Sequence, residues 1–288
     1  KDQYAMAWSL LKVWNTQNNP PLEITELKMV FESILKREAT KEKTPEEIEI
    51  VSLAEAAKQN EQEVKIRSTT GFQFLDDASK GGFGQGELWV IGAPQGHGKT
   101  TLGMEMTLKL AANGVKTLWL TYELLVDELW EKFKTMGAPE YFQSYTTLKQ
   151  FRGDIGIIEK VIAKAVAQEG VKVVFVDHFG RLGGKIDKYD SGIATNLAAY
   201  LATLAERLKV LSLEQRVCIV LMAHTRKPQR GQKQTTSDLA NTSGLGNEAT
   251  MSLILDREVD EMAFDEGDKY SEKLFVRVDK SRWGKETT

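Results

Sequence analysis

Cysteine and histidine are scarce in this sequence of 288 residues, which contains one cysteine and three histidines. A single thiol cannot close an intrachain disulfide, so a disulfide-stapled fold is excluded. Cys218 lies inside the apolar run 217–222, and we expect it to be a buried bystander rather than a catalytic thiol. Because no group of histidines and cysteines with metal-ligand spacing occurs, we expect no metal site of that kind.

Long uncharged apolar runs are also missing, and we therefore expect no membrane span. No signal peptide is evident, so we expect a cytoplasmic protein. The chain begins at Lys1 rather than Met, and we expect it to be a piece of a longer protein. Apolar residues make up 41% of the sequence and charged residues 27%, which is enough for a globular core. The net charge of −3 means that a nucleic-acid ligand would need local basic loops rather than a basic surface.

Residues 1–62 are predicted to form a helical N-terminal segment. Helical apolar spacing runs over residues 4–14 and 24–39, and a further helix is predicted over 44–60. Its start has Thr44 as N-cap, followed by proline and then by glutamate three residues after the cap. Its narrow apolar stripe comprises Ile50, Leu53 and Ala57. This helix is expected to pack on its own domain, and the alternative is a linker helix that docks on a neighbouring subunit.

Residues 63–288 are predicted to form an α/β domain. Short apolar runs alternate with helical stretches, among them a helix that starts at Lys99 and is closed by Asn113 and Gly114. Nearly continuous apolar strands are typical of a parallel sheet covered on both faces, so we expect a mostly parallel, doubly wound sheet. The predicted strands are 87–93, 116–123, 171–178, 217–224, 251–257 and 273–282. Ligands of such sheets bind at the carboxyl ends of the strands.

The stretch GAPQGHGKTTL, residues 92–102, follows the first predicted strand and opens a helix. It matches the phosphate-binding loop pattern with alanine in place of the first glycine. Glycines in such a loop let backbone N–H groups converge on phosphates, the lysine reaches phosphate oxygens, and the threonine hydroxyl ligates Mg²⁺. His97 is interpreted as a spacer or a substrate contact. The residues predicted to bind ATP are Ala93, Pro94, Gln95, Gly96, His97, Gly98, Lys99, Thr100 and Thr101.

Polar side chains end three other predicted strands. Asp177 is predicted to hold Mg²⁺ together with Thr100. Glu123 is predicted to orient and deprotonate the attacking water, although it could also be an ordinary surface glutamate. His224 is predicted to sense the γ-phosphate, and its alternative is an ordinary histidine at the end of a strand.

Basic residues are concentrated in the loops that follow two of these strands, although the chain as a whole is acidic. Flexible basic loops beside an ATP site favour binding of a nucleic-acid backbone over merely solvated loops. The candidate DNA-binding residues are Arg181, Lys185, Lys188, Arg226, Lys227, Arg230 and Lys233. Lys280 and Arg282 lie two residues apart near the end of the last predicted strand, where two cations on one side could stabilise phosphate charge, including that of a neighbouring subunit.

Several of these segments together resemble the ATPase domain of the hexameric replicative DNA helicases, the DnaB/Twinkle family with its phage relatives. Residues 69–102 resemble the family's first motif, and LWLTYELLVDEL at 118–129 resembles the motif of its catalytic glutamate. VVFVDHFGRL at 173–182 resembles the Walker B segment, and IVLMAHTRKP at 219–228 the sensor motif. SDLANTSGLGNEAT at 237–250 resembles the fourth motif. VDKSRWG at 278–284 resembles the finger motif, the last of the family's motifs found here.

The resemblance implies a RecA-like P-loop NTPase that hydrolyses ATP with Mg²⁺ between the subunits of a homo-oligomeric, hexameric ring. It implies that Lys280 and Arg282 reach the neighbour's nucleotide. The loops 180–192 and 225–244 would line a central channel and bind single-stranded DNA, and the helix 44–60 would be a subunit-swapping linker. A primase or a helicase loader is implied as a partner.

The sequence also departs from the family pattern. Asp177 is followed by His-Phe-Gly instead of the commoner Tyr-Leu-Gln, and Asn247-Glu248 replaces a usual Glu-Gln pair. The glutamine of that pair is thought to couple the nucleotide to the DNA loop, so the coupling residue is open here. Two other functions are considered: a RecA/RadA-type ATPase of recombination, which the paired cations also fit, and an ATP-gated loader without unwinding, against which Glu123 argues.

Overall fold

The computed structural model describes residues 2–18, 20–39, 52–55, 67–139, 142–147, 155–183, 197–226, 234–239, 243–259 and 270–283. The chain divides into two compact units, Lys1–Val64 and Lys65–Thr288, and each is described by itself. Most of the predicted helix 44–60 lies outside the described residues. Within the described parts, no helix combines the length and the apolar character needed to cross a bilayer.

The first unit contains two helices, α1 (Asp2–Asn15) and α2 (Ile24–Ala39), as the apolar spacing predicts. Asn15 ends α1 and fixes the turn between the helices, because its Nδ2 donates to the Leu22 carbonyl at 2.8 Å and its Oδ1 accepts from the Leu22 N–H at 3.0 Å. Leu27 and Phe31 of α2 are buried, and the Phe31 ring lies 5.3 Å from that of Trp8.

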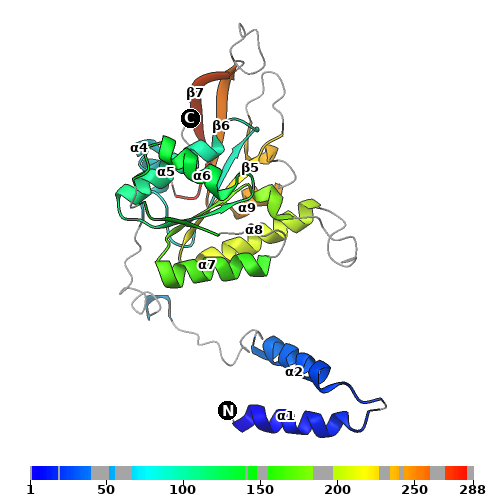
Figure 1. Cartoon of the computed structure of the whole chain (residues 1–288). Helices are drawn as coiled ribbons and strands as arrows, with labels where there is room; N and C mark the ends of the chain where they lie inside the picture. Colours follow the sequence, from blue (N-terminus) through cyan, green and yellow to red (C-terminus); the bar gives the residue numbers. More distant parts are fainter. Residues whose placement is uncertain are drawn as a thin grey trace. The chain divides into compact units, whose positions relative to one another are not determined.

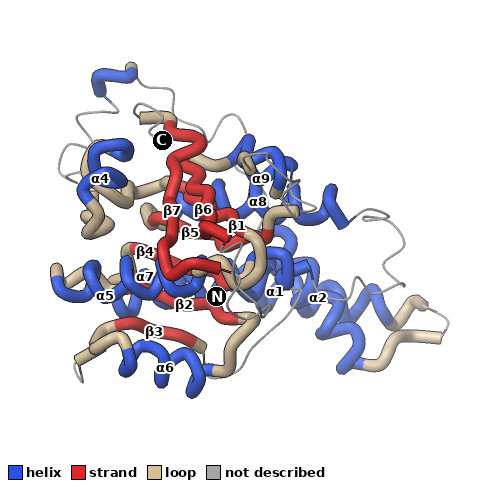
Figure 2. The backbone as a smooth tube through the Cα atoms, turned by 90° about the horizontal axis from the view of Figure 1, so that it is seen from above, coloured by secondary structure: helices blue, strands red, loops and turns tan. Residues whose placement is uncertain are grey.

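The second unit is built on a seven-stranded sheet in the order β3-β2-β4-β5-β1-β6-β7, which Figure 2 shows. All neighbouring strands are parallel except β6 and β7, which pair antiparallel. The prediction of a mostly parallel sheet is therefore confirmed. The strands are β1 (Leu88–Ala93), β2 (Thr117–Thr121), β3 (Ser144–Thr146), β4 (Val173–Asp177), β5 (Cys218–His224), β6 (Met251–Val259) and β7 (Tyr270–Ser281).

Helices cover both faces of this sheet, because successive side chains of a buried strand point to opposite faces. On β1, Trp89 and Ile91 belong to one hydrophobic cluster, and Leu88 and Val90 to the other. The first cluster is completed by α4 (Gln73–Ser79), α5 (Lys99–Ala112) and α6 (Val126–Thr135). The second is completed by α7 (Ile155–Glu169), α8 (Leu197–Glu214) and α9 (Ser243–Glu248), which includes the α7 and α8 layer seen in Figure 1.

The strand order brings the predicted site residues to one edge of the sheet. Parallel pairing sets Ala93 beside His224, and Thr121 beside Asp177. Asp177 and His224 are the last residues of β4 and β5, and Glu123 follows the end of β2 by two residues. The sequence places Glu123 inside its strand, whereas β2 ends at Thr121, because Thr121 Oγ1 accepts from the Leu124 N–H at 3.2 Å and turns the chain.

Candidate functional site: a phosphate loop at the carboxyl edge of the sheet

The phosphate loop joins β1 to the N-terminus of α5. Gly96 and Gly98 have φ values of +78° and +84°, which residues with a side chain rarely adopt. Gly98 caps α5, so the free N–H groups of the first turn of that helix face the loop. An added Cβ at Gly96 would meet no atom within 4 Å, which shows open space above the loop. This backbone is suited to binding an anion such as a phosphate.

The lysine of this loop is buried and turned onto the chain itself. Lys99 Nζ donates to the carbonyls of Ala93 at 3.1 Å and Pro94 at 3.0 Å, and lies 2.9 Å from Nδ1 of His224. Burial lowers the pKa of Lys99, and the nearby carboxylates of Asp177 and Glu123 oppose that shift. A phosphate at the loop would replace these neutral acceptors with charged ones.

The hydrogen bonds of His224 assign its tautomer. Lysine is only a donor, so Nδ1 of His224 accepts from Lys99, and the ring proton lies on Nε2. Nε2 then donates to Oε1 of Glu123 at 3.3 Å. Two consecutive hydrogen bonds, called the relay here, thus connect Lys99 to His224 and His224 to Glu123.

Thr100 and Asp177 form the predicted Mg²⁺ position. Thr100 Oγ1 donates to Oδ2 of Asp177 at 2.7 Å. The other carboxylate oxygen, Oδ1, is buried, and the described residues offer it no hydrogen-bond partner. Burial raises the pKa of Asp177 to about 6, while the bond from Thr100 lowers it. A hydroxyl and an incompletely bonded carboxylate side by side are the donor set that Mg²⁺ uses with phosphates, so these residues fit that ion.

Glu123 is ionised, because the hydrogen bond from His224 lowers its pKa to about 2 against the opposing effect of burial. Arg181 Nε lies 3.8 Å from Oε1 of Glu123. Arg181 is a candidate DNA-binding residue, and the structure places its half-exposed guanidinium beside the predicted catalytic carboxylate. The carboxylate is therefore held between a histidine and an arginine.

His178 is a member of the site that the sequence does not single out as functional. Its ring centroid lies 4.0 Å from that of His224, edge to face, and its Nδ1 is buried with no hydrogen-bond partner in the described chain. Burial lowers the pKa of His178 to about 4, so its ring is neutral at pH 7. The ligand atoms of Glu123, His178 and His224 lie within 4.8 Å of one another. Within this trio, Nε2 of His224 donates to Glu123 at 3.3 Å.

Other predicted site residues are placed as follows. His97 is buried and its Nδ1 lies 3.1 Å from the Gln95 carbonyl, so it helps to shape the loop. Arg226 is exposed just after β5. The candidates Lys185, Lys188, Lys227, Arg230 and Lys233 lie outside the described residues. Cys218 is buried at the start of β5, as predicted.

Lys280 and Arg282 lie far from the phosphate loop of their own chain. The Arg282 N–H donates to the Thr250 carbonyl at 3.0 Å, and the Thr250 N–H donates to the Leu88 carbonyl at 2.7 Å. Arg282 is therefore level with the first residue of β1, about 16 Å along the strand from its end at Ala93. Lys280 pairs with Ser252. Neither side chain can reach the phosphate loop of its own chain.

Both cations rest on the C-terminus of α9. Lys280 Nζ donates to the carbonyls of Gly246 at 2.6 Å and Asn247 at 3.2 Å, and Arg282 Nη2 donates to the Asn247 carbonyl at 3.1 Å. Lysine and arginine are favourable at this end of a helix. Partial burial lowers the pKa of Lys209 on α8, and the charge of Arg282 lowers it further, so a third cation lies close by.

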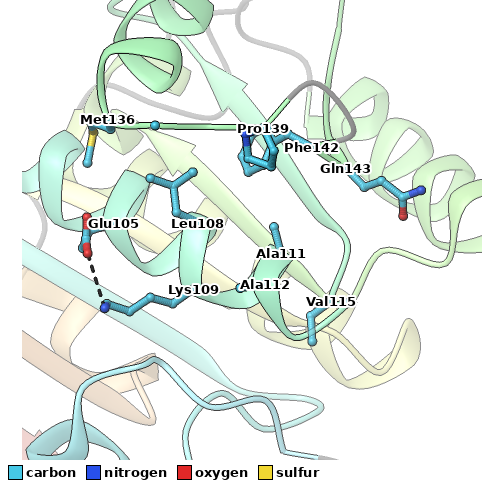
Figure 3. A pocket seen from close by; sticks show the side chains of 12 residues that line it. Glu105, Leu108, Lys109, Ala111, Ala112, Val115, Met136, Pro139, Phe142 and Gln143 are labelled. Carbon is cyan, nitrogen blue, oxygen red and sulfur yellow. Dashed lines mark ion pairs between the residues drawn. The ribbon is translucent and has the colours of Figure 1, made fainter.

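Two pockets lie beside α5. The pocket of Figure 3, of about 550 Å³, lies between the second half of α5 and the chain after α6, beside the Glu105–Lys109 ion pair of 3.4 Å, and contains none of the predicted site residues. The other, of about 580 Å³, lies at the start of α5. Its lining combines Thr101 with three aromatic side chains, namely Phe72, Phe74 and Phe275. Sequence reasoning missed this second pocket, because its aromatics come from distant segments.

Known proteins resemble this chain both in sequence and in fold. No protein-family model matches the chain. The replicative DNA helicase DnaB of Treponema pallidum (strain Nichols) is 24% identical over 239 residues, which cover 74% of this chain and 53% of that protein. The chain thus spans about half the length of this curated relative.

Two solved structures share the fold. One, described as an ATPase domain, superposes with a TM-score of 0.65 at 15% identity, covering 83% of this chain and 94% of that one. A DnaB-like replicative helicase, described with its interactions with primase, gives a TM-score of 0.63 at 16% identity, covering 99% and 73%. The predicted resemblance to DnaB-like replicative helicases is confirmed, and so is the RecA-like fold.

Proposed function

We propose that this chain is the ATP-hydrolysing motor of a ring-forming DNA helicase, which moves along single-stranded DNA and unwinds duplex. The observation that carries the proposal is the convergence of Lys99, Thr100, Asp177, Glu123 and His224 at one edge of the sheet. The DnaB-like similarity supports a helicase over a recombination ATPase of the same fold.

In this proposal the triphosphate of ATP binds across the phosphate loop and the N-terminus of α5. Lys99 exchanges its bonds to the loop carbonyls and to His224 for bonds to phosphate oxygens. The base lies in the aromatic pocket at the start of α5, where Phe275 is exposed and available for stacking. Thr100 and Asp177 hold Mg²⁺, which when bound neutralises phosphate charge.

Hydrolysis proceeds by attack of water on the γ-phosphorus, with cleavage of the bond to the bridging oxygen. Glu123 orients the water and accepts its proton. When Lys99 moves to the phosphates, Nδ1 of His224 loses its donor, so the bond from His224 to Glu123 becomes sensitive to whether the loop is filled. Lys280 and Arg282 act on the nucleotide of the adjoining subunit of a hexameric ring, because they lie at the opposite end of their own sheet.

The test is hydrolysis of ATP by the full chain with and without single-stranded DNA, followed by unwinding of a forked duplex. The proposal predicts DNA-stimulated hydrolysis and strand displacement that both require Mg²⁺. DNA-dependent hydrolysis with strand exchange in a D-loop assay and no unwinding of the fork would instead show a recombination ATPase. Partners such as a primase or a loader are part of the same proposal, since the solved DnaB-like helicase is described with primase.

A further inference from the structure

The segment Gln234–Leu239, called the loop root here, lies directly beside the end of β5. Thr225 Oγ1 donates to Oε1 of Gln234 at 3.0 Å, and the Arg226 N–H donates to the Asp238 carbonyl at 2.7 Å. Thr225 also bridges Leu239 in antiparallel fashion. Thr225 follows His224, so the loop root is fastened one residue away from the histidine that Lys99 contacts.

The loop root is also hydrogen-bonded to β7, the strand that carries Lys280. Thr236 donates twice to Oδ2 of Asp279, from its N–H at 2.7 Å and from its hydroxyl at 2.5 Å. Arg277 Nη2 donates to the Gln234 carbonyl, and the same guanidinium pairs with Oδ1 of Asp279 at 3.5 Å. The Asp279 side chain is only 17% exposed. Hydrogen bonds to a carboxylate are stronger than those between neutral groups, so this junction is a firm attachment.

Thr236 also contacts α9, whose C-terminal carbonyls accept hydrogen bonds from Lys280 and Arg282. A Cβ added at Gly246 would come within 2.6 Å of Thr236 Cγ2, so only glycine allows this close approach. The carbonyl of Gly246 accepts from Lys280, which directly follows Asp279. Thr236 therefore contacts both α9, to which Lys280 donates, and Asp279, the residue before Lys280 on β7.

We propose that the Thr236–Asp279 junction couples the loop between β5 and α9 to the finger cations Lys280 and Arg282. The inference rests on the proposed function, in which that loop contacts DNA and the cations act on the next subunit's nucleotide. A displacement of the loop root by DNA is transmitted through Asp279 to the adjacent Lys280. Neither Thr236 nor Asp279 reaches the reacting atoms, so both are positioning residues.

In this proposal, the junction couples the nucleotide to the DNA loop, a role for which Asn247-Glu248 lacks the family's usual glutamine. Gly246 and Asn247 contact the cations through their backbone carbonyls, so these bonds do not depend on the side chain of Asn247. The bond from the Thr236 hydroxyl to Asp279, in contrast, requires both side chains, and the bond from the Thr236 N–H requires that of Asp279. Communication between the loop and the finger in this chain therefore runs through β7.

The experiment compares the full chain with its Thr236→Val, Thr236→Ser and Asp279→Asn variants. ATP turnover is measured without DNA and at saturating single-stranded DNA, and DNA affinity is measured by fluorescence anisotropy. Allosteric couplings are typically worth about 5- to 150-fold. We expect the ratio of stimulated to unstimulated turnover to fall at least ~5-fold in Thr236→Val and Asp279→Asn. Thr236→Ser, which keeps the hydroxyl, should restore the ratio.

Thr146→Val is the matched control, because it removes a similar hydroxyl bond, 2.8 Å to the Trp119 carbonyl, at the far edge of the sheet. Its ratio should equal that of the unaltered chain. The double variant Thr236→Val/Asp279→Asn should lose less than the sum of the two single losses, since both changes weaken one junction.

A ratio unchanged in Thr236→Val and Asp279→Asn overturns the inference while leaving the proposed function intact. The same holds if the variants lose only DNA affinity and reach full stimulation at higher DNA concentration, which would show a local role in folding the loop. If the unaltered chain hydrolyses ATP without any response to DNA, the proposed function fails and the inference fails with it.

Discussion

Lys99 and His224 are joined by a 2.9 Å contact between Nζ and Nδ1, which links the phosphate loop to the end of β5. Lys99 is thus held by acceptors that carry no net charge. An incoming phosphate competes with them through charge-assisted hydrogen bonds, which are about twice as strong as neutral ones. In the proposed function, phosphate binding would therefore release His224 from Lys99.

Lys99→Ala should lose ATP binding, because it removes the only buried cation at the loop among the described residues. Loss of a charge-assisted contact to phosphate costs about 2–3 kcal/mol, or roughly 30- to 150-fold in affinity. Titration calorimetry with ATP and Mg²⁺ measures the effect. Lys132→Ala, exposed on α6, is the control and should bind normally. Equal affinities of the two variants would remove Lys99 from the site.

Glu123→Gln should bind ATP but hydrolyse it about 10²-fold more slowly, as expected for loss of a general base. Glutamine keeps an oxygen for Nε2 of His224, so the relay stays in place while the proton acceptor is gone. Single-turnover hydrolysis separates this loss from any change in binding. Glu131→Gln, exposed on α6, is the comparison. Near-normal turnover in Glu123→Gln would assign the base elsewhere.

Phe275→Ala should weaken ATP binding about 10-fold, since stacking of a base on an aromatic ring is worth about 1–3 kcal/mol. Inorganic tripolyphosphate, which has no base, should compete equally well for the variant and the unaltered chain. The two competition curves, recorded side by side, test whether the pocket at the start of α5 holds the base. A parallel loss of affinity for both ligands would mean that the change disturbs the phosphate loop instead.

Asp177→Asn should stabilise the nucleotide-free protein in EDTA at pH 7–8. The pKa of Asp177 is raised to about 6 in the folded chain, so folding favours its protonated form. Stability is therefore lost as the pH rises from about 4 to about 6, by about 2–3 kcal/mol, and asparagine avoids that loss. Below pH 4 the gain should vanish.

Denaturant unfolding at several pH values measures this effect, with the exposed Asp127→Asn as the control. The same Asp177→Asn change should abolish the extra stabilisation that ATP confers when Mg²⁺ is added. A variant that is less stable than the unaltered chain at pH 8 in EDTA would contradict the argument from burial.

Local patterns were sufficient to predict the core of the fold and which residues meet at the carboxyl edge of the sheet. Buried strands ending in Asp177 and His224 and the glycine-rich turn before Lys99 are encoded in consecutive residues, so their convergence follows from parallel pairing. The edge strand Ser144–Thr146 was not predicted, because three partly exposed residues carry no apolar run.

Long-range contacts between side chains could not be predicted. The bond from Thr236 to Asp279 joins residues 43 positions apart, and nothing in either segment indicates the other. The edge-to-face contact of His178 with His224 depends on the lateral order of β4 and β5. The position of Lys280 and Arg282, far from their own loop, follows from the antiparallel direction of β7.

The central claim is that ATP is cleaved between subunits, and mixing two inactive variants tests it most directly. Lys99→Ala subunits keep the finger cations, and Arg282→Ala subunits keep the phosphate loop. In a 1:1 mixed ring, about a quarter of the interfaces between neighbours would then join an intact loop to an intact Arg282. We predict that each variant alone is inactive and that mixing restores hydrolysis to a corresponding fraction. Mixed assemblies that remain as inactive as the separate variants would contradict the account.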